Sequence, residues 1–110
     1  MKLPSASAAI VDERKISLYL LNPAHPDNGG KAAYFEALGF ARSQPSVLAE
    51  AIRQAATGDI LKSVPSPHGE KYLIDAFVTS PEGRVGPIRT IWIVDKGTTT
   101  PRFVTAYPRE

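Results

Sequence analysis

The spacing of apolar residues changes at Gly58, and this change constrains the fold more than any other feature of the chain. Before Gly58, apolar side chains recur every three or four residues, which is the period of an amphipathic helix. After Gly58, the chain contains four runs rich in β-branched and aromatic residues: Ile60–Val64, Lys71–Thr79, Val85–Val94 and Arg102–Tyr107. Because the links between these runs are short, we expect an antiparallel meander.

Three segments before Gly58 are predicted as helices: Asp12–Leu21, Lys31–Leu38 and a segment that begins near Pro45 and ends before Gly58. Asp12 has the side chain of a good N-cap, and either Asp27 or Asn28 is expected to cap the second helix. Gly39 is expected to close that helix in the left-handed conformation. The segment Ala6–Val11 fits either a short strand or an extended lead-in. The predicted fold is α+β, with three N-terminal helices packed on one face of a four-stranded antiparallel meander.

The composition is that of an ordinary globular domain. At 110 residues and 43% hydrophobic content, the chain is expected to form a single domain over residues 1–110. A net charge of +2 permits an anionic partner without requiring one. There is no cysteine, so neither a disulfide framework nor a thiolate metal site is expected.

The sequence contains neither a signal-peptide pattern nor an apolar run of the roughly 20 residues that a membrane span needs. A cytoplasmic location without membrane contact is therefore expected. Two isolated histidines and no H-E-x-x-H motif argue against a metal site, and no cofactor-binding motif is found. The oligomeric state is left open, although four strands leave two edges, near Ile60 and Pro108, that could pair with a second copy.

Several residues in the last two β-rich runs could form a ligand-binding surface. Side chains alternate across a strand, so Thr90 and Trp92 share one face while Arg89 lies on the other. If Thr105 and Tyr107 lie beside Thr90 and Trp92, the sheet carries hydroxyl and aromatic groups that can bind a nucleotide.

The alternative interpretation is that the aromatic residues Trp92, Phe103 and Tyr107 belong to the core against the helices. Arg89 lies within an apolar strand, where an unpaired charge is costly. It is therefore expected to have a partner, either Asp75 on the neighbouring strand or a bound anion.

The loop before the second predicted helix carries the strongest candidates for acid–base chemistry. His25 lies in a segment rich in proline and glycine, and Lys31 begins the helix that follows. An imidazole can transfer a proton near neutral pH, and an ammonium can stabilise charge on a phosphate. With Arg89 and Thr105, these groups would suffice for RNA cleavage without a metal. An exposed turn residue is the alternative for His25, and also describes His68.

The chain resembles a family of small bacterial domains catalogued as a domain of unknown function. The resemblance covers nearly the whole chain and lies in the following segments: Tyr19-Leu-Leu21, His25-Pro26, Lys31-Ala32, Leu38-Gly-Phe40, Thr90-Ile-Trp-Ile93 and Pro101-Arg-Phe-Val-Thr-Ala-Tyr-Pro108. The helix-then-sheet layout and the ending Val104-Thr-Ala-Tyr107 are similar to the barnase, EndoU, colicin and RelE assemblage of RNA-cutting toxins. That second resemblance implies catalytic or phosphate-binding roles for His25, Lys31, Arg89 and Thr105.

Two functions are therefore expected from different classes. The first is a metal-independent endoribonuclease toxin that acts on RNA and pairs with a small acidic antitoxin or immunity protein. Its catalytic residues would be His25, Lys31, Arg89 and Thr105, and its substrate-binding residues Thr90, Trp92 and Tyr107. The second is a non-catalytic module that binds a protein or ligand on the sheet face.

Overall fold

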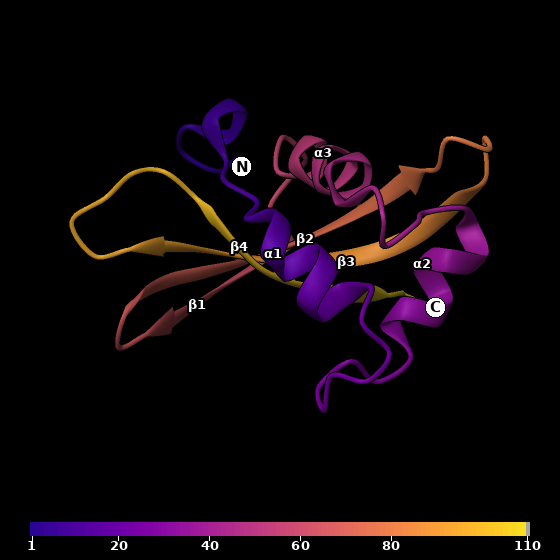
Figure 1. Ribbon diagram of the computed structural model, residues 1–110. Coiled ribbons are helices and arrows are strands. Elements are labelled where there is room, and N and C mark those ends of the chain that lie inside the picture. Colours follow the sequence, from indigo (N-terminus) through magenta and orange to yellow (C-terminus); the bar gives the residue numbers. More distant parts are fainter. Residues whose placement is uncertain (110) are drawn as a thin grey trace.

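The helical half of the chain packs on one face of a four-stranded antiparallel sheet (Figure 1). The computed structural model describes residues 1–109. The helical elements are η1 (Ala6–Ala8), α1 (Glu13–Lys15), η2 (Ile16–Leu20), α2 (Lys31–Leu38) and α3 (Pro45–Ala55). The strands are β1 (Lys62–Ser66), β2 (Gly69–Thr79), β3 (Val85–Asp95) and β4 (Arg102–Pro108), and they pair in that order. The predicted α+β class and meander are confirmed.

The first predicted helix forms as α1 followed directly by a wider, π-type turn, η2. The Asp12 carboxylate accepts a hydrogen bond from the Arg14 N–H at 2.9 Å, which is the expected N-cap. The Leu21 N–H donates to the Ile16 carbonyl, five residues earlier, at 2.8 Å. Such insertions widen a helix and change the direction of the side chains that follow. Here the apolar side chains Ile16, Leu20 and Leu21 are all fully buried.

The expected strand or extended lead-in at Ala6–Val11 forms only in part, because Ala6–Ala8 is the 3-10 turn η1 and only the residues after it are extended along β4. Ile10 forms an isolated parallel bridge with Arg102. The Ile10 N–H donates to the Pro101 carbonyl, and the Phe103 N–H donates to the Ile10 carbonyl, both at 2.9 Å. The lead-in therefore covers the start of the outer edge of β4.

The loop that leads into α2 is organised by Asn28, which is 2% exposed. Its amide nitrogen donates to the Tyr19 and Leu20 carbonyls at 2.7 and 3.0 Å, and its amide oxygen accepts from the Ala32 N–H at 3.0 Å. The N-cap of α2 is Gly30, which has no capping side chain, so the expected cap by Asp27 or Asn28 is wrong; Asn28 instead bonds to the first turn from two positions before the cap and ties that helix to η2. Gly39 closes α2 at a φ of 118°, as predicted.

α3 begins with Pro45 at its first turn and places Leu48 and Ile52, both fully buried, against the sheet. β2 and β3 form the long central hairpin, with Tyr72 opposite Trp92 and Ile74 opposite Thr90. Within residues 1–109, no helix is both long and apolar enough to cross a membrane.

A β-bulge in β4 changes which of its side chains face the core. Trp92 pairs with Phe103, but Ile91 pairs with Thr105, so one extra residue lies between these pairs on β4. Beyond the bulge, Arg89 pairs with Tyr107 and Thr90 with Ala106. Thr105 and Tyr107 therefore do not lie beside Thr90 and Trp92, and the proposed shared patch is not formed.

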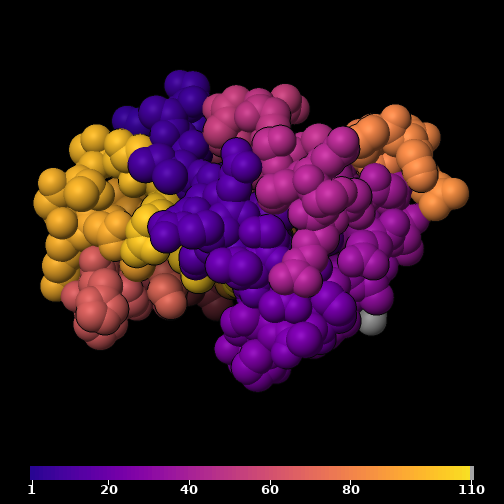
Figure 2. Space-filling view, viewed as in Figure 1, coloured from indigo at the N-terminus to yellow at the C-terminus, as the bar shows by residue number. Residues whose placement is uncertain are grey.

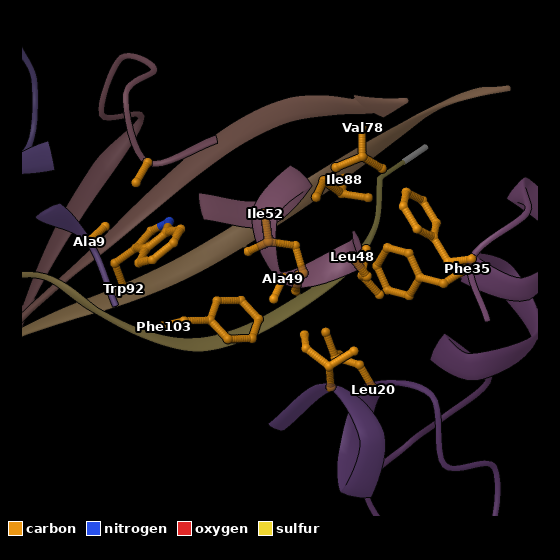
Figure 3. Close-up of a cluster of buried hydrophobic side chains, with 14 of the residues drawn as sticks. Ala9, Leu20, Phe35, Leu48, Ala49, Ile52, Val78, Ile88, Trp92 and Phe103 are labelled. Carbon is orange, nitrogen blue, oxygen red and sulfur yellow. The ribbon is translucent and has the colours of Figure 1, made fainter. Parts of the chain in front are cut away.

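The core lies between the helices and the sheet (Figure 3). The rings of Trp92 and Phe103 meet edge to face, with their centroids 5.5 Å apart. The indole N–H donates to the Thr90 hydroxyl at 2.8 Å, and that hydroxyl donates to the Ile74 carbonyl at 2.8 Å. The two polar groups are therefore satisfied inside an apolar core.

Candidate functional site

Three of the four predicted catalytic residues meet around one side chain, Tyr19 of η2. The His25 ring contacts the Tyr19 ring edge to face, with 5.0 Å between centroids. The Lys31 ammonium nitrogen lies 5.6 Å from the centroid of the same ring, within the range of a cation–π contact. The Tyr19 hydroxyl is hydrogen-bonded to the Thr105 hydroxyl at 2.8 Å. Tyr19 therefore links the loop, the start of α2 and the edge strand β4.

The loop 22–30 holds His25 and Lys31 in place through backbone groups. The His25 Nδ1 atom accepts a hydrogen bond from the Asp27 N–H at 3.0 Å. The Lys31 ammonium donates to the Asp27 and Asn28 carbonyls at 3.1 and 3.2 Å. In Figure 2, this loop forms the purple protrusion at the lower edge of the molecule. Both side chains are half-buried, so each keeps part of its surface open to solvent.

These contacts define what the two groups can donate. Because Nδ1 of His25 is an acceptor, the neutral imidazole carries its proton on Nε2. The Lys31 ammonium has three N–H groups, and two of them meet carbonyl oxygens. One N–H group and the positive charge remain for another acceptor. The pair can therefore present hydrogen-bond donors and one full charge to an anion such as a phosphate.

Arg89 has the protein partner that its position in an apolar strand predicts. Its Nε and Nη2 atoms donate to the Asp75 carboxylate at 2.7 and 3.0 Å. The Arg109 guanidinium is 3.6 Å from the same carboxylate. The Arg89 hydrogen bonds hold the pKa of Asp75 below its usual value, and the Asp75 carboxylate raises the pKa of Arg89.

Arg89 lies near the Tyr19 cluster but on the open face of the sheet. It pairs with Tyr107, which is two residues from Thr105 on β4. Two residues along a strand span about 7 Å, so Arg89 and Thr105 can contact neighbouring groups of one extended ligand. Tyr107 is half-buried beside Arg89 and contributes to raising the pKa of Arg89.

The remaining predicted residues lie elsewhere. Thr90 and Trp92 are both 0% exposed, so they occupy the core and present no surface to a ligand in this structure. Trp92 and Phe103 are core residues, as the alternative interpretation predicts. His68 is exposed in the turn between β1 and β2. Within residues 1–109, no three His, Asp or Glu side chains gather as a metal site would require.

Sequence reasoning did not single out Tyr19 or Asn28 as site residues. Helical spacing assigns Tyr19 only to the inner side of the first helix, and Asn28 appears only as a possible cap. The Tyr19–Thr105 contact joins residues 86 positions apart. The one local signal was the clustering of Tyr19, His25 and Lys31 within thirteen positions of the sequence.

The chain belongs to the family described as Domain of unknown function (DUF6883), whose model matches residues 2–110. This finding confirms the first resemblance. No curated protein matches the chain.

A chain in the solved structure of a contact-dependent growth inhibition toxin–immunity protein complex from Klebsiella pneumoniae 342 is similar to this one. The two share 24% sequence identity and superpose with a TM-score of 0.75, over 96% of this chain and 97% of the other. At this identity, the likeness establishes a shared fold.

Proposed function

We propose that this domain is a toxin that cleaves RNA without a metal, using the cluster around Tyr19. The observation that carries the proposal is the convergence of His25, Lys31 and Thr105 on that one ring. These residues come from a loop, a helix and a strand, and the sequence predicts all three as catalytic residues. The similar chain belongs to a complex of a toxin with its immunity protein, which supports a role in a pair of that kind.

The reaction is an internal transesterification of the RNA backbone. The 2′-oxygen forms a bond to phosphorus and loses its proton, and the bond from phosphorus to the 5′-oxygen breaks. The leaving oxygen gains a proton, so the products are a 2′,3′-cyclic phosphate and a 5′-hydroxyl. Negative charge builds up on the phosphoryl oxygens in the transition state, and donors fixed in advance stabilise it.

Each residue has a role that follows from its contacts. The Lys31 ammonium neutralises charge on the phosphoryl oxygens. While Nδ1 of His25 accepts from the Asp27 N–H, its Nε2–H group donates a hydrogen bond to the reacting oxygens, and a proton can be taken up or delivered at Nε2 only after the Nδ1 contact opens. Thr105 donates a hydrogen bond to the phosphate while it keeps its contact with Tyr19. Arg89 and Tyr107 bind the neighbouring nucleotide on the open face.

The proposed toxin acts in the cytoplasm, where its RNA substrate is found, and a small acidic immunity protein or antitoxin neutralises it. The chain carries a net charge of +2, so an acidic inhibitor is the complementary partner.

A non-catalytic binding module is the second candidate. The observation that favours it is that most polar groups of the predicted catalytic residues are already bonded within the protein: Asp75 neutralises Arg89, and backbone groups occupy Nδ1 of His25 and two of the three donors of Lys31. In that case, the sheet face would bind a protein or a ligand, and RNA would be left intact.

The test uses purified protein and a defined single-stranded RNA in the presence of a chelator. Wild type is expected to cut the RNA and leave 2′,3′-cyclic phosphate ends. Because positioned acid–base groups contribute about 10²- to 10⁴-fold, the His25→Ala, Lys31→Ala double variant should lose at least that much activity.

His68→Ala is the matched control, since His68 is exposed in a turn far from the cluster in sequence. It should cut at the wild-type rate. If wild type leaves the RNA intact across neutral pH, the nuclease proposal fails and the binding module remains. Equal loss of activity in the His68→Ala variant would show that the cluster is not the site.

A further inference from the structure

The outer edges of the sheet are protected in different ways against pairing with a strand of another chain, and one stretch of edge lacks such protection. The outer edge of β4 is covered by the lead-in at Ile10 and by contacts from Lys15 and Tyr19. β1 is a short edge strand of five residues that carries Lys62 and Pro65. Lysine, proline and short length are the features that keep an edge strand from pairing with other chains. The unprotected stretch lies on β2.

β2 is longer than its neighbour β1, so half of its outer edge has no partner strand. β1 pairs only with Gly69–Leu73, whereas β2 continues to Thr79. Beyond Leu73, β2 pairs with β3 alone within residues 1–109. This part of β2 carries neither lysine nor proline. The structure therefore leaves an open edge at residues 75–79.

The direction of the backbone groups can be read from the register. In an antiparallel ladder, successive residues direct their N–H and C=O groups to alternate edges. The Ser80 N–H donates to the Arg84 carbonyl, in the same register as β2 and β3. Even-numbered residues of β2 therefore bond to β3, and odd-numbered residues point outward. The outward groups on the open edge belong to Asp75, Phe77 and Thr79.

A groove of about 690 Å³ runs beside this edge. One wall is Ala76–Thr79 of β2, and the other is the C-terminal half of α3 together with Thr57 and Gly58. Phe77 is 67% exposed here, although a ring of this size is usually covered. In Figure 1, α3 lies above this part of β2, and in both Figure 1 and Figure 2 the hairpin between β2 and β3 projects to the upper right.

We infer that the open edge of β2 is a docking site for an extended, acidic strand of a partner protein. The strand would add to the sheet beside Asp75–Thr79, and its backbone would bond to the three outward-facing residues. Its side chains would enter the groove on one face and cover Phe77 on the other. This site is separate from the Tyr19 cluster, and the inference does not depend on RNA cleavage.

Two observations define the occupant. Arg53 in the groove is already paired with Glu50 at 2.6 Å. Arg89 and Arg109, however, share the single carboxylate of Asp75 beside the open edge. The Arg109 guanidinium lies 5.5 Å from the centre of the Phe77 ring. The edge therefore carries a net positive charge, and an acidic strand is the complementary one. A second copy of this chain fits less well. Its own open edge is flanked by its own α3, so that helix would approach the groove of the first copy when the two edges pair. The second copy also carries the same net charge of +2.

The experiment measures amide hydrogen exchange by NMR, with a synthetic nine-residue peptide of alternating valine and glutamate as the probe. In the free protein, the Asp75, Phe77 and Thr79 amides should exchange faster than those of Ile74, Ala76 and Val78, which bond to β3. Peptide at millimolar concentration should slow the three outward amides about tenfold or more. A peptide that is N-methylated at alternate residues should have no effect, because it lacks the donors for pairing.

Thr79→Pro removes one outward N–H without breaking a bond to β3, and Thr79→Ala keeps that N–H. The proline variant should lose the protection, whereas the alanine variant should keep it. The inference is overturned if the outward amides show no slowing, or if the N-methylated peptide slows them equally. It is also overturned if they are already protected in the free protein and this protection rises with protein concentration, because a second copy would then be the occupant. The peptide comparison decides the question even if Thr79→Pro fails to fold.

Discussion

Asp75 is the carboxylate on the open face of the sheet that contacts two guanidinium groups. It accepts two hydrogen bonds from Arg89 and lies 3.6 Å from Arg109, and its side chain is only 20% exposed. A carboxylate that is bonded in the folded state has a lowered pKa there, so its ionised form stabilises the fold. At the scale of single residues, the ionisation of Asp75 therefore makes the free energy of unfolding sensitive to acid.

The sign of the pH dependence follows from that lowered pKa. The stabilisation by Asp75 is fully present above the ordinary aspartate pKa of 3.8 and is lost as the pH falls through the lower folded-state value. Asp75→Asn should therefore reduce the free energy of unfolding at neutral pH by about 2 kcal/mol, a typical value for hydrogen bonds to a charged group. The variant should lose less stability than wild type between about pH 5 and pH 2.

Urea unfolding at a series of pH values measures both effects. Asp59→Asn is the control, since Asp59 pairs with Lys2 at the surface and its side chain is 78% exposed. That variant should stay close to wild type at neutral pH. An Asp75→Asn variant with the wild-type pH dependence would contradict this account.

At the scale of elements, the loop 22–30 is held by one buried side chain. Asn28 makes three hydrogen bonds that join η2 to α2 and position His25 and Lys31 between them. Removal of this side chain leaves the Tyr19 and Leu20 carbonyls and the Ala32 N–H without their hydrogen-bond partner at a buried position. The junction between the two helical elements therefore depends on this residue.

Asn28→Ala should lower the free energy of unfolding by about 2 to 4 kcal/mol, from three hydrogen bonds at about 1 kcal/mol each and the cost of leaving buried groups unpaired. Thermal unfolding followed by circular dichroism measures the change. Asp27→Ala is the matched control, because the Asp27 side chain is exposed, and it should stay within about 0.5 kcal/mol of wild type. Equal stability of the two variants would show that Asn28 does not hold the junction.

At the scale of the whole molecule, one tryptophan reports on the packing of both layers. Trp92 is 0% exposed and belongs to a core cluster that includes residues of α3, η2, β2, β3 and β4. Neither the helices nor the sheet can bury its apolar face without the other. The two layers should therefore unfold together.

We expect Trp92 fluorescence and far-ultraviolet circular dichroism to give coincident urea transitions, with emission shifting to longer wavelength as Trp92 meets water. Coincidence of the two probes is the test of two-state unfolding. A fluorescence change that precedes loss of helix would mean that the layers separate before either unfolds, contrary to the prediction.

Most of the secondary structure could be predicted from the sequence because its signals are local. Pro45, Gly39 and the cap at Asp12 act within one turn of a helix, and the alternation of apolar residues defines the strands. The candidate site was predicted only in part. His25, Lys31 and Thr105 do converge, whereas Thr90 and Trp92 are buried in the core.

The sequence by itself determined the change from helices to strands at Gly58 and the meander that follows, because these depend on spacing within a few residues. Only the tertiary structure decided the bulge in β4, the contact of Tyr19 with Thr105 and the open edge of β2. Each of these depends on how distant segments align across strands and layers. A one-residue change in alignment moves a side chain to the other face of the sheet, and no local pattern records it.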